Sequence, residues 1–128
     1  MRFGYVAPPF EGVWFDAVAL LDKAVRKGGN EWSDVRRALW NETAQLWLTV
    51  EDKPVAAFVT RMDGDTIECW LAGGKVGPTA PMIEQTILKA AREGGATNAR
   101  IVGRKGWARV FKPYGWRVQD DELVKDFA

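Results

Sequence analysis

Histidine is absent from the 128 residues, and cysteine occurs once, as Cys69. Without an imidazole the chain cannot form a Ser-His-Asp or Cys-His nucleophilic site, and it cannot form a histidine-containing zinc motif. A single cysteine forms no internal disulfide and no cysteine-rich metal cage. We therefore expect no metal site, and any chemistry must use carboxylates, other polar side chains, backbone amides or a bound cofactor.

Long apolar runs and a strong net charge are also missing. No stretch approaches the roughly 20 apolar residues that span a bilayer, and residues 1–12 lack the apolar core of a signal peptide. The net charge of +1 draws the protein to neither nucleic acid nor membranes. The remaining composition, 47% apolar and 27% charged, is that of a globular protein. We expect a single domain, residues 1–128, in the cytoplasm, with no membrane partner.

Hydrophobic periodicity predicts an α/β fold with the order β-α-α-β-β-β-α-β-α-β. A three- to four-residue period favours helices, and strict alternation favours strands. Short turns join the three central strands, which indicates an antiparallel meander. A further strand is possible over residues 123–127. The expected helices cover residues 12–27, 33–43, 80–93 and 106–112, and the expected strands cover residues 2–6, 46–50, 55–62, 66–72, 99–102 and 114–118.

A glycine-rich turn over residues 73–78 opens the helix that follows the meander, and a strand, a short helix and another strand come next. The last of these segments, Ala-Arg-Val-Phe-Lys-Pro-Tyr-Gly-Trp over residues 108–116, matches the pattern Ala-x-x-Tyr-x-x-x-Gly-Phe. In element order and in this segment the chain resembles the GNAT superfamily of N-acetyltransferases. The resemblance implies a mixed, mostly antiparallel central sheet flanked by helices.

In the GNAT superfamily a Gln/Arg-x-x-Gly-x-Gly/Ala turn holds the pyrophosphate of acetyl-CoA at a helix N-terminus, where unpaired amides and the helix dipole favour an anion. Pro78 takes the place of the first glycine; it has no N–H to donate and its φ is fixed. The alternative is a glycine-rich turn that holds no ligand. The resemblance assigns acetyl-CoA binding to the turn and to the end of the third meander strand, that is, to Leu71, Ala72, Lys75, Val76, Gly77, Thr79 and Ala80.

The catalytic groups of the family also map onto altered positions. The tyrosine that protonates the leaving thiolate falls on Phe111, and a phenyl ring cannot act as a general acid. Tyr114 is the candidate substitute, or else a tyrosine packed at a helix end. Glu68 is the candidate general base on the third meander strand, or else an exposed residue of the sheet.

Two other patterns leave alternatives open. Residues 100–117 carry basic and aromatic side chains with no acidic residue, which suits nucleic acid, an acidic partner or the 3′-phosphate of CoA. Trp32 and Trp40, among seven tryptophans, lie about two helical turns apart and are expected to share a helix face. That face either lines a protein interface or fills the core.

Residues 103–109, Gly115-Trp116 and residues 123–125 resemble small GNAT-like proteins of tailed bacteriophages. This resemblance implies a place in the host cytoplasm or in a virion, with phage structural proteins as partners, and an oligomer is also compatible with it. With Pro78 and Phe111, it favours a protein whose acetyl transfer is lost or reduced and which acts by binding other proteins. The alternatives are an active acetyl-CoA-dependent N-acetyltransferase and a nucleic-acid-binding protein.

Overall fold

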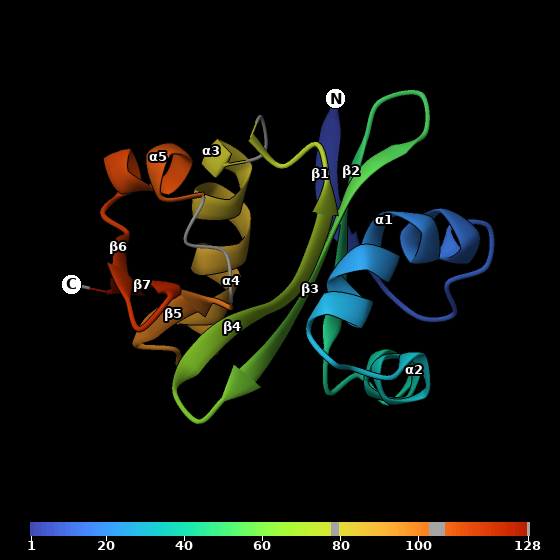
Figure 1. Ribbon diagram of the computed structural model, residues 1–128, viewed down its shortest axis with the longest axis horizontal. Helices are drawn as coiled ribbons and strands as arrows, with labels where there is room; N and C mark the ends of the chain where they lie inside the picture. The colour runs from blue at the N-terminus through green and yellow to red at the C-terminus, as the bar shows by residue number, and fades with distance from the viewer. Residues whose placement is uncertain (78–79, 103–106, 128) are drawn as a thin grey trace.

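Seven strands form one sheet in the order β1-β2-β3-β4-β5-β7-β6 (Figure 1). The computed structural model describes residues 1–77, 80–102 and 107–127. Pairing is antiparallel throughout except between β4 and β5, which run parallel, so the mixed, mostly antiparallel sheet is confirmed. The strands are β1 (Arg2–Val6), β2 (Gln45–Val50), β3 (Pro54–Asp63), β4 (Thr66–Gly74), β5 (Asn98–Ile101), β6 (Arg117–Gln119) and β7 (Glu122–Asp126).

Helices cover both faces of the sheet. One face carries α1 (Trp14–Lys27) and α2 (Trp32–Trp40). The other face carries a continuous helical segment made of α3 (Ala80–Met82), a π-helical turn (Ile83–Ile87) and α4 (Leu88–Glu93). The short α5 (Ala108–Phe111) packs with this second group. Among the described residues, no helix is long and apolar enough to cross a membrane.

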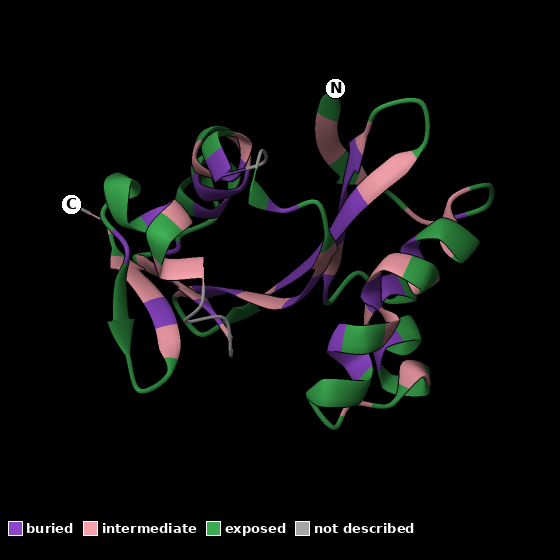
Figure 2. Cartoon of the chain, turned by 45° about the horizontal axis from the view of Figure 1, so that its top comes forward, coloured by how far each residue is buried: buried purple, intermediate pink, exposed green. Residues whose placement is uncertain are grey.

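Alternation along β3 builds two separate cores. Ala56 and Phe58 pack under the α3–α4 segment, whereas Ala57 and Val59 pack under α1 and α2. Successive side chains of a strand point to opposite faces, so this strand, the third from the β1 edge, has apolar residues at both sets of positions. The buried strands and inner helix faces appear in purple in Figure 2.

The predicted order of elements is confirmed, with two differences near the C-terminus. The predicted strand over residues 114–118 starts only at Arg117, because Lys112–Tyr114 form a 3-10 turn that ends at Gly115 with φ of 91°. The strand considered over residues 123–127 is present as β7, and it separates β6 from β5. The positive φ explains why glycine stands at position 115.

A partly buried ionic contact ties the C-terminal strands to the helical segment. The Trp116 Nε1 donates to Glu84 Oε1 at 2.5 Å, and the Lys125 ammonium donates to Glu84 Oε2 at 2.6 Å. Both carboxylate oxygens are therefore satisfied although the side chain is largely buried. This contact fixes the Gly115-Trp116 turn against the helix.

Candidate functional site

The strands β4 and β5 part after a short stretch of parallel pairing. β5 pairs with β4 from Thr66 to Cys69, and one further hydrogen bond joins the Val102 N–H to the Cys69 carbonyl at 3.2 Å. β4 then continues to Gly74 paired with β3. A pair of diverging strands therefore lies in the middle of the sheet (Figure 1).

A β-bulge at Trp70 lies at the point of divergence. Cys69 pairs with Thr60 and Leu71 pairs with Val59, so Trp70 is the extra residue on β4. The bulge turns Leu71 to the α1 side, while Ile67 and Cys69 contact the core under α3–α4. Regular alternation would place Ile67, Cys69 and Leu71 on one face, and the bulge moves Leu71 to the opposite face.

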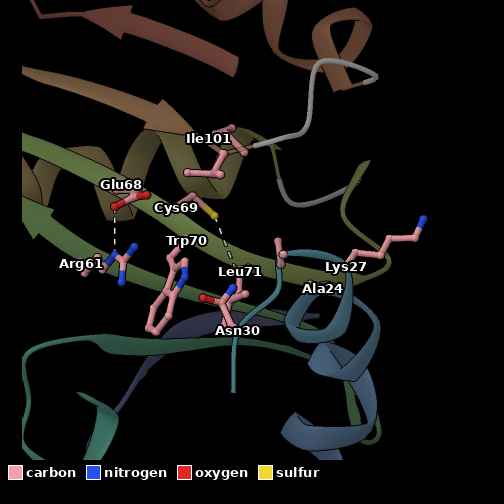
Figure 3. Close-up of a pocket in the computed structure, with 12 residues that line it drawn as sticks. Ala24, Lys27, Asn30, Arg61, Glu68, Cys69, Trp70, Leu71 and Ile101 are labelled. Atoms are coloured by element: carbon pink, nitrogen blue, oxygen red, sulfur yellow. Dashed lines mark hydrogen bonds and ion pairs between the residues drawn. The ribbon is translucent and has the colours of Figure 1, made fainter. Parts of the chain in front are cut away.

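Two adjoining hollows follow the gap between the strands. Their volumes are about 390 and 370 Å³, and Ala24, Lys27 and Ala72 line both. The first lies beside the bulge (Figure 3) and is also lined by Gly28, Asn30, Arg61, Glu68, Cys69, Trp70, Leu71, Ile101 and Val102. The second continues toward the start of α3 and is also lined by Leu20, Lys23, Gly73, Gly74, Val76, Gly77 and Trp107.

The glycine pair at the end of β4 lets α1 pack closely enough to form the opposite wall of the cleft. A Cβ at Gly73 would lie 1.9 Å from the Leu20 carbonyl oxygen of α1. Gly74 has φ of +89°, and a Cβ there would lie 2.2 Å from the Val55 carbonyl oxygen. Glycine is thus required here by close backbone packing, whether or not a ligand binds the turn.

The coenzyme-binding residues predicted from the sequence divide into three groups. Leu71, Ala72, Val76 and Gly77 line the hollows. Ala80 is buried at the start of α3. Lys75 lines neither hollow, and Thr79 lies outside the described residues. The structure thus brings the end of β4 and the following turn to one continuous cleft.

Lys75 points away from the cleft. Its amide donates to the Val55 carbonyl at 2.9 Å, and its ammonium lies 4.0 Å from a Glu51 carboxylate oxygen. The backbone of Lys75 is therefore used to extend the pairing with β3. Pro78 and Thr79 lie outside the described residues, so the expectation that Pro78 weakens an anion site stays a prediction.

Glu68 occupies the bulge end of the cleft with its side chain buried. Its Oε2 accepts a hydrogen bond from Arg61 Nε at 2.9 Å and lies 3.5 Å from Arg100 Nη2. Arg61, Glu68 and Arg100 are cross-strand neighbours on β3, β4 and β5. Glu68 is therefore not the exposed sheet residue that the sequence left open as one alternative.

Arg100 is shared among several carboxylates. It donates to Asp63 at 2.7 Å and lies 3.7 Å from Glu122. The hydrogen bond to Asp63 raises the pKa of the Arg100 guanidinium, partly offset by burial, and the negative charge of Glu68 adds to the increase. Arg100 therefore keeps its charge wherever the protein is folded, and Glu68 always has a cation beside it.

Replacing Glu68 with glutamine is expected to lower the free energy of unfolding by about 1–2 kcal/mol, because Arg61 then loses its charged partner while Arg100 keeps Asp63. Urea denaturation measures the change. Asp126→Asn is the matched control, since it breaks the exposed pair with Arg117, and we expect a change below about 0.5 kcal/mol. Equal effects of the two substitutions would contradict this role of Glu68.

Arg61 and Trp70 are site residues that the sequence analysis missed. The Arg61 Cζ lies 3.9 Å from the centroid of the Trp70 ring, so the guanidinium stacks on the indole. The signal for Arg61 was present in the Asp63–Thr66 hairpin, whose register places Arg61 directly opposite Glu68. The contact with Trp70 could not be found that way, because it depends on the bulge.

Tyr114 does not reach the cleft in the part of the chain that the structure describes. It ends the 3-10 turn after α5 with its side chain exposed, and it lines neither hollow. Phe111, which stands at the tyrosine position of the family, is fully buried and lies 5.6 Å from the Trp116 ring. Neither residue is placed to exchange a proton in the cleft.

The basic stretch is partly neutralised. Arg100 contacts three carboxylates, and Arg117 pairs with Asp126 at 3.0 Å. Arg104 and Lys105 lie outside the described residues. Nucleic-acid binding therefore stays a prediction, and Arg100 and Arg117 are less available for phosphates than the sequence suggested.

The tryptophan face expected on α2 is present. Trp32 and Trp40 line a third hollow of about 530 Å³ between α1 and α2, together with Trp14, Val18, Ser33, Arg36 and Arg37. The Trp14 ring meets the Trp40 ring edge-on at 4.8 Å, and Arg36 lies over Trp40 at 4.9 Å. The rings thus pack on each other and still border an open groove.

Metal chemistry has no visible ligand set in the described ranges. No group of three or more Asp, Glu or Cys side chains there is arranged to hold an ion. The cleft accordingly offers a carboxylate, guanidinium and ammonium groups, a thiol and backbone amides.

Comparisons of sequence and of structure give different results. No protein-family model matches the sequence, and no curated protein sequence matches it. Solved structures do match over nearly the whole chain. A GNAT family acetyltransferase from Elizabethkingia anophelis with acetyl-CoA bound has a TM-score of 0.64 at 14% identity, covering 98% of this chain and 97% of that one.

Two further structures agree. A Bacillus subtilis acetyltransferase in complex with CoA has a TM-score of 0.66 at 14% identity, and the alignment covers 99% of both chains. A probable acetyltransferase from Staphylococcus epidermidis has a TM-score of 0.77 at 10% identity, again covering 99% of both chains. Together with the diverging β4 and β5 strands, these matches show that the chain has the fold of the GNAT acetyltransferases.

Proposed function

We propose that this protein binds acetyl-CoA in the cleft between β4 and β5 and transfers the acetyl group to an amine. The observation that carries the proposal is the divergence of β4 from β5 after Cys69, which leaves two adjoining hollows along the end of β4. The Elizabethkingia and Bacillus structures that share this fold contain acetyl-CoA and CoA, respectively.

The residues of the cleft fit such a molecule along its length. The first hollow, which Leu71 and Ala72 line at the end of β4, suits the elongated pantetheine arm. The second hollow adds Val76, Gly77 and the ammonium groups of Lys23 and Lys27, which suit an anionic diphosphate. The thioester end then reaches the bulge at Trp70.

When bound there, acetyl-CoA supplies an activated acyl carbon. The amine nitrogen attacks this carbon, the C–N bond forms and the C–S bond breaks. Arg61 and Arg100 both contact Oε2 of Glu68. We therefore assign Oε1 as the atom that accepts the proton released by the amine, directly or through water. Water returns a proton to the leaving thiolate, since Tyr114 lines neither hollow.

Tyr114→Phe is therefore expected to leave kcat within about twofold of the unchanged protein, because loss of a true general acid typically costs about 10²-fold or more. Acetyl transfer to an amine, followed by release of free thiol, measures the effect. A decrease of the larger size would place Tyr114 in the reaction and contradict the assignment of water.

A second candidate function is supported by the groove between α1 and α2. The groove is lined by three tryptophan rings and by Arg36 and Arg37. This lining suits a segment of another protein that carries both acidic side chains and apolar anchor residues. In this alternative, acetyl transfer is lost or reduced and the chain acts as a phage-type binding protein, in keeping with its resemblance to phage GNAT-like proteins. Binding of acetyl-CoA without turnover of any amine would favour this alternative.

Charge reversal tests the groove directly. We expect the double variant Arg36→Glu and Arg37→Glu to bind an acidic, tryptophan-containing model peptide with at least tenfold lower affinity, measured by fluorescence polarisation. The same reversal at Arg117, which lies outside the groove, is expected to leave the affinity unchanged. No binding of the peptide to the unaltered protein would remove this candidate.

A further inference from the structure

We propose that the amine accepted by this protein also carries an anionic group, a carboxylate or a phosphate, and that Arg61 holds this group. The inference rests on the proposed function, because it names the class of acceptor for the same cleft. It is carried by the way in which Arg61 is fixed beside the bulge at the end of the first hollow (Figure 3).

Arg61 is held in place by two neighbours. Its Nε donates to Glu68 at 2.9 Å, and its Cζ lies over the Trp70 ring, 3.9 Å from the ring centroid. Neither contact uses the terminal Nη1 and Nη2 groups, and 39% of the side chain remains exposed. The two terminal groups form the fork that binds carboxylates and phosphates in a bidentate manner.

Fixing Arg61 in advance favours binding. A free arginine side chain loses much rotational freedom when it grips an anion, and Glu68 and Trp70 have already imposed that cost in the folded protein. The geometry is that of a preorganised anion receptor.

The charges of the first hollow point to the same class. Among the described residues, its lining contains Lys27 and Arg61 as cations and Glu68 as the one carboxylate, and Glu68 also lies beside Arg100. A polyamine or another acceptor with several positive charges would therefore meet repulsion. In an amine that also carries an anionic group, the anion can face Arg61 while the amine faces Glu68.

The size and position of the hollow limit the acceptor. A volume of about 390 Å³, part of it needed for the acyl end, suits a small molecule rather than a folded protein. Arg61 and the bulge at Trp70 are adjacent, so the anionic group and the reacting nitrogen must be separated by a short linker. Amino acids and aminoalkyl phosphates meet this requirement.

Matched pairs of amines test the inference. The kcat/KM for acetylation is measured for β-alanine against propylamine, and for O-phosphoethanolamine against ethanolamine, so that the two pairs separate carboxylate from phosphate. We expect the preferred anionic amine to exceed its neutral partner at least tenfold. Arg61→Gln should reduce that preference, the ratio of the two kcat/KM values, at least tenfold; the ratio cancels any effect of the substitution on Glu68 that neutral and anionic amines share.

Arg26→Gln is the control, because Arg26 is an exposed arginine of α1 that lines neither hollow. It should leave the preference unchanged. Calorimetry with acetyl-CoA is run on all three proteins. Binding of acetyl-CoA together with equal use of neutral and anionic amines, or an unchanged preference in Arg61→Gln, overturns the inference and leaves the proposed function standing.

The anion site is also tested without the reaction. Calorimetry with each anionic amine alone should show binding that Arg61→Gln weakens at least tenfold. If this holds while acetyl-CoA does not bind, the anion site stands and the proposed function is overturned. If no anionic amine binds to the unaltered protein, with or without CoA, the inference is overturned.

Discussion

Replacing Gly73 with alanine is expected to lower the free energy of unfolding by about 3 kcal/mol or more, the upper range for overpacked sites. A Cβ at this position would lie 1.9 Å from the Leu20 carbonyl oxygen, and backbone atoms cannot yield as the end of a flexible side chain can. The α1 helix must therefore move away from β4, or the strand must bend. Urea denaturation measures the loss, which corresponds to a decrease in Tm of roughly 10 °C.

Gly4→Ala is the control for this experiment. Gly4 lies on β1, its φ is not in the left-handed region, and a Cβ there would have no neighbour within 4 Å. We expect a change within about 0.5 kcal/mol, or slight stabilisation through a smaller entropy of the unfolded chain. A Gly73→Ala protein as stable as the Gly4→Ala protein would show that α1 does not pack on β4 at this distance.

Replacing Ala24 with leucine is expected to weaken acetyl-CoA binding by about 10- to 100-fold, that is, by roughly 1.4–3 kcal/mol. Ala24 lies on α1 and lines both hollows, so a larger side chain there narrows the cleft where the two hollows meet. Isothermal titration calorimetry measures the change in Kd. Circular dichroism confirms that the variant is folded.

Ala19→Leu provides the matched control. Ala19 lies on the same helix with its side chain exposed, so the substitution adds the same atoms outside the cleft. We expect its Kd for acetyl-CoA to stay within twofold of the unaltered protein. Equal affinities of the Ala24→Leu and Ala19→Leu proteins would mean that acetyl-CoA, if it binds, binds elsewhere.

The arrangement of the elements could be predicted from the sequence because the periodicities are local and unambiguous. α1 buries Ala17, Leu21, Ala24 and Val25 at helical spacing, and β3 has apolar residues suited to a strand covered on both faces. Element order and the Gly115-Trp116 turn then indicated the GNAT-like fold. The structure confirms the mixed, mostly antiparallel sheet that this resemblance implied.

The candidate site was only partly predictable, because its geometry depends on departures from regular structure. The bulge at Trp70 moves Leu71 to the α1 face, and no local pattern marks that extra residue. Lys75 occupies the expected position along the chain, yet its amide pairs with Val55. Glu68 stays a candidate base proposed from its residue type and position, and its two arginine partners come from the strands on either side.

The proton-transfer roles show the limit of motif transfer most clearly. The tyrosine position of the family falls on Phe111, which cannot donate a proton. Tyr114 was therefore proposed as the acid, because it lies only three residues further along the chain. Pro113 and the positive φ of Gly115 instead form a 3-10 turn that leaves Tyr114 exposed. Two residues three positions apart at the end of α5 thus lie on different sides of the chain, Phe111 in the core and Tyr114 at the surface.

Titration of the unaltered protein with acetyl-CoA in a calorimeter tests the central claim most directly. We predict binding at one site, with a Kd between about 1 µM and 1 mM, the range in which enzymes commonly bind their substrates. The same titration with Ala24→Leu should give the weaker binding described above. Absence of any heat change with millimolar acetyl-CoA, while the protein remains folded, would contradict the claim that the cleft between β4 and β5 is a coenzyme site.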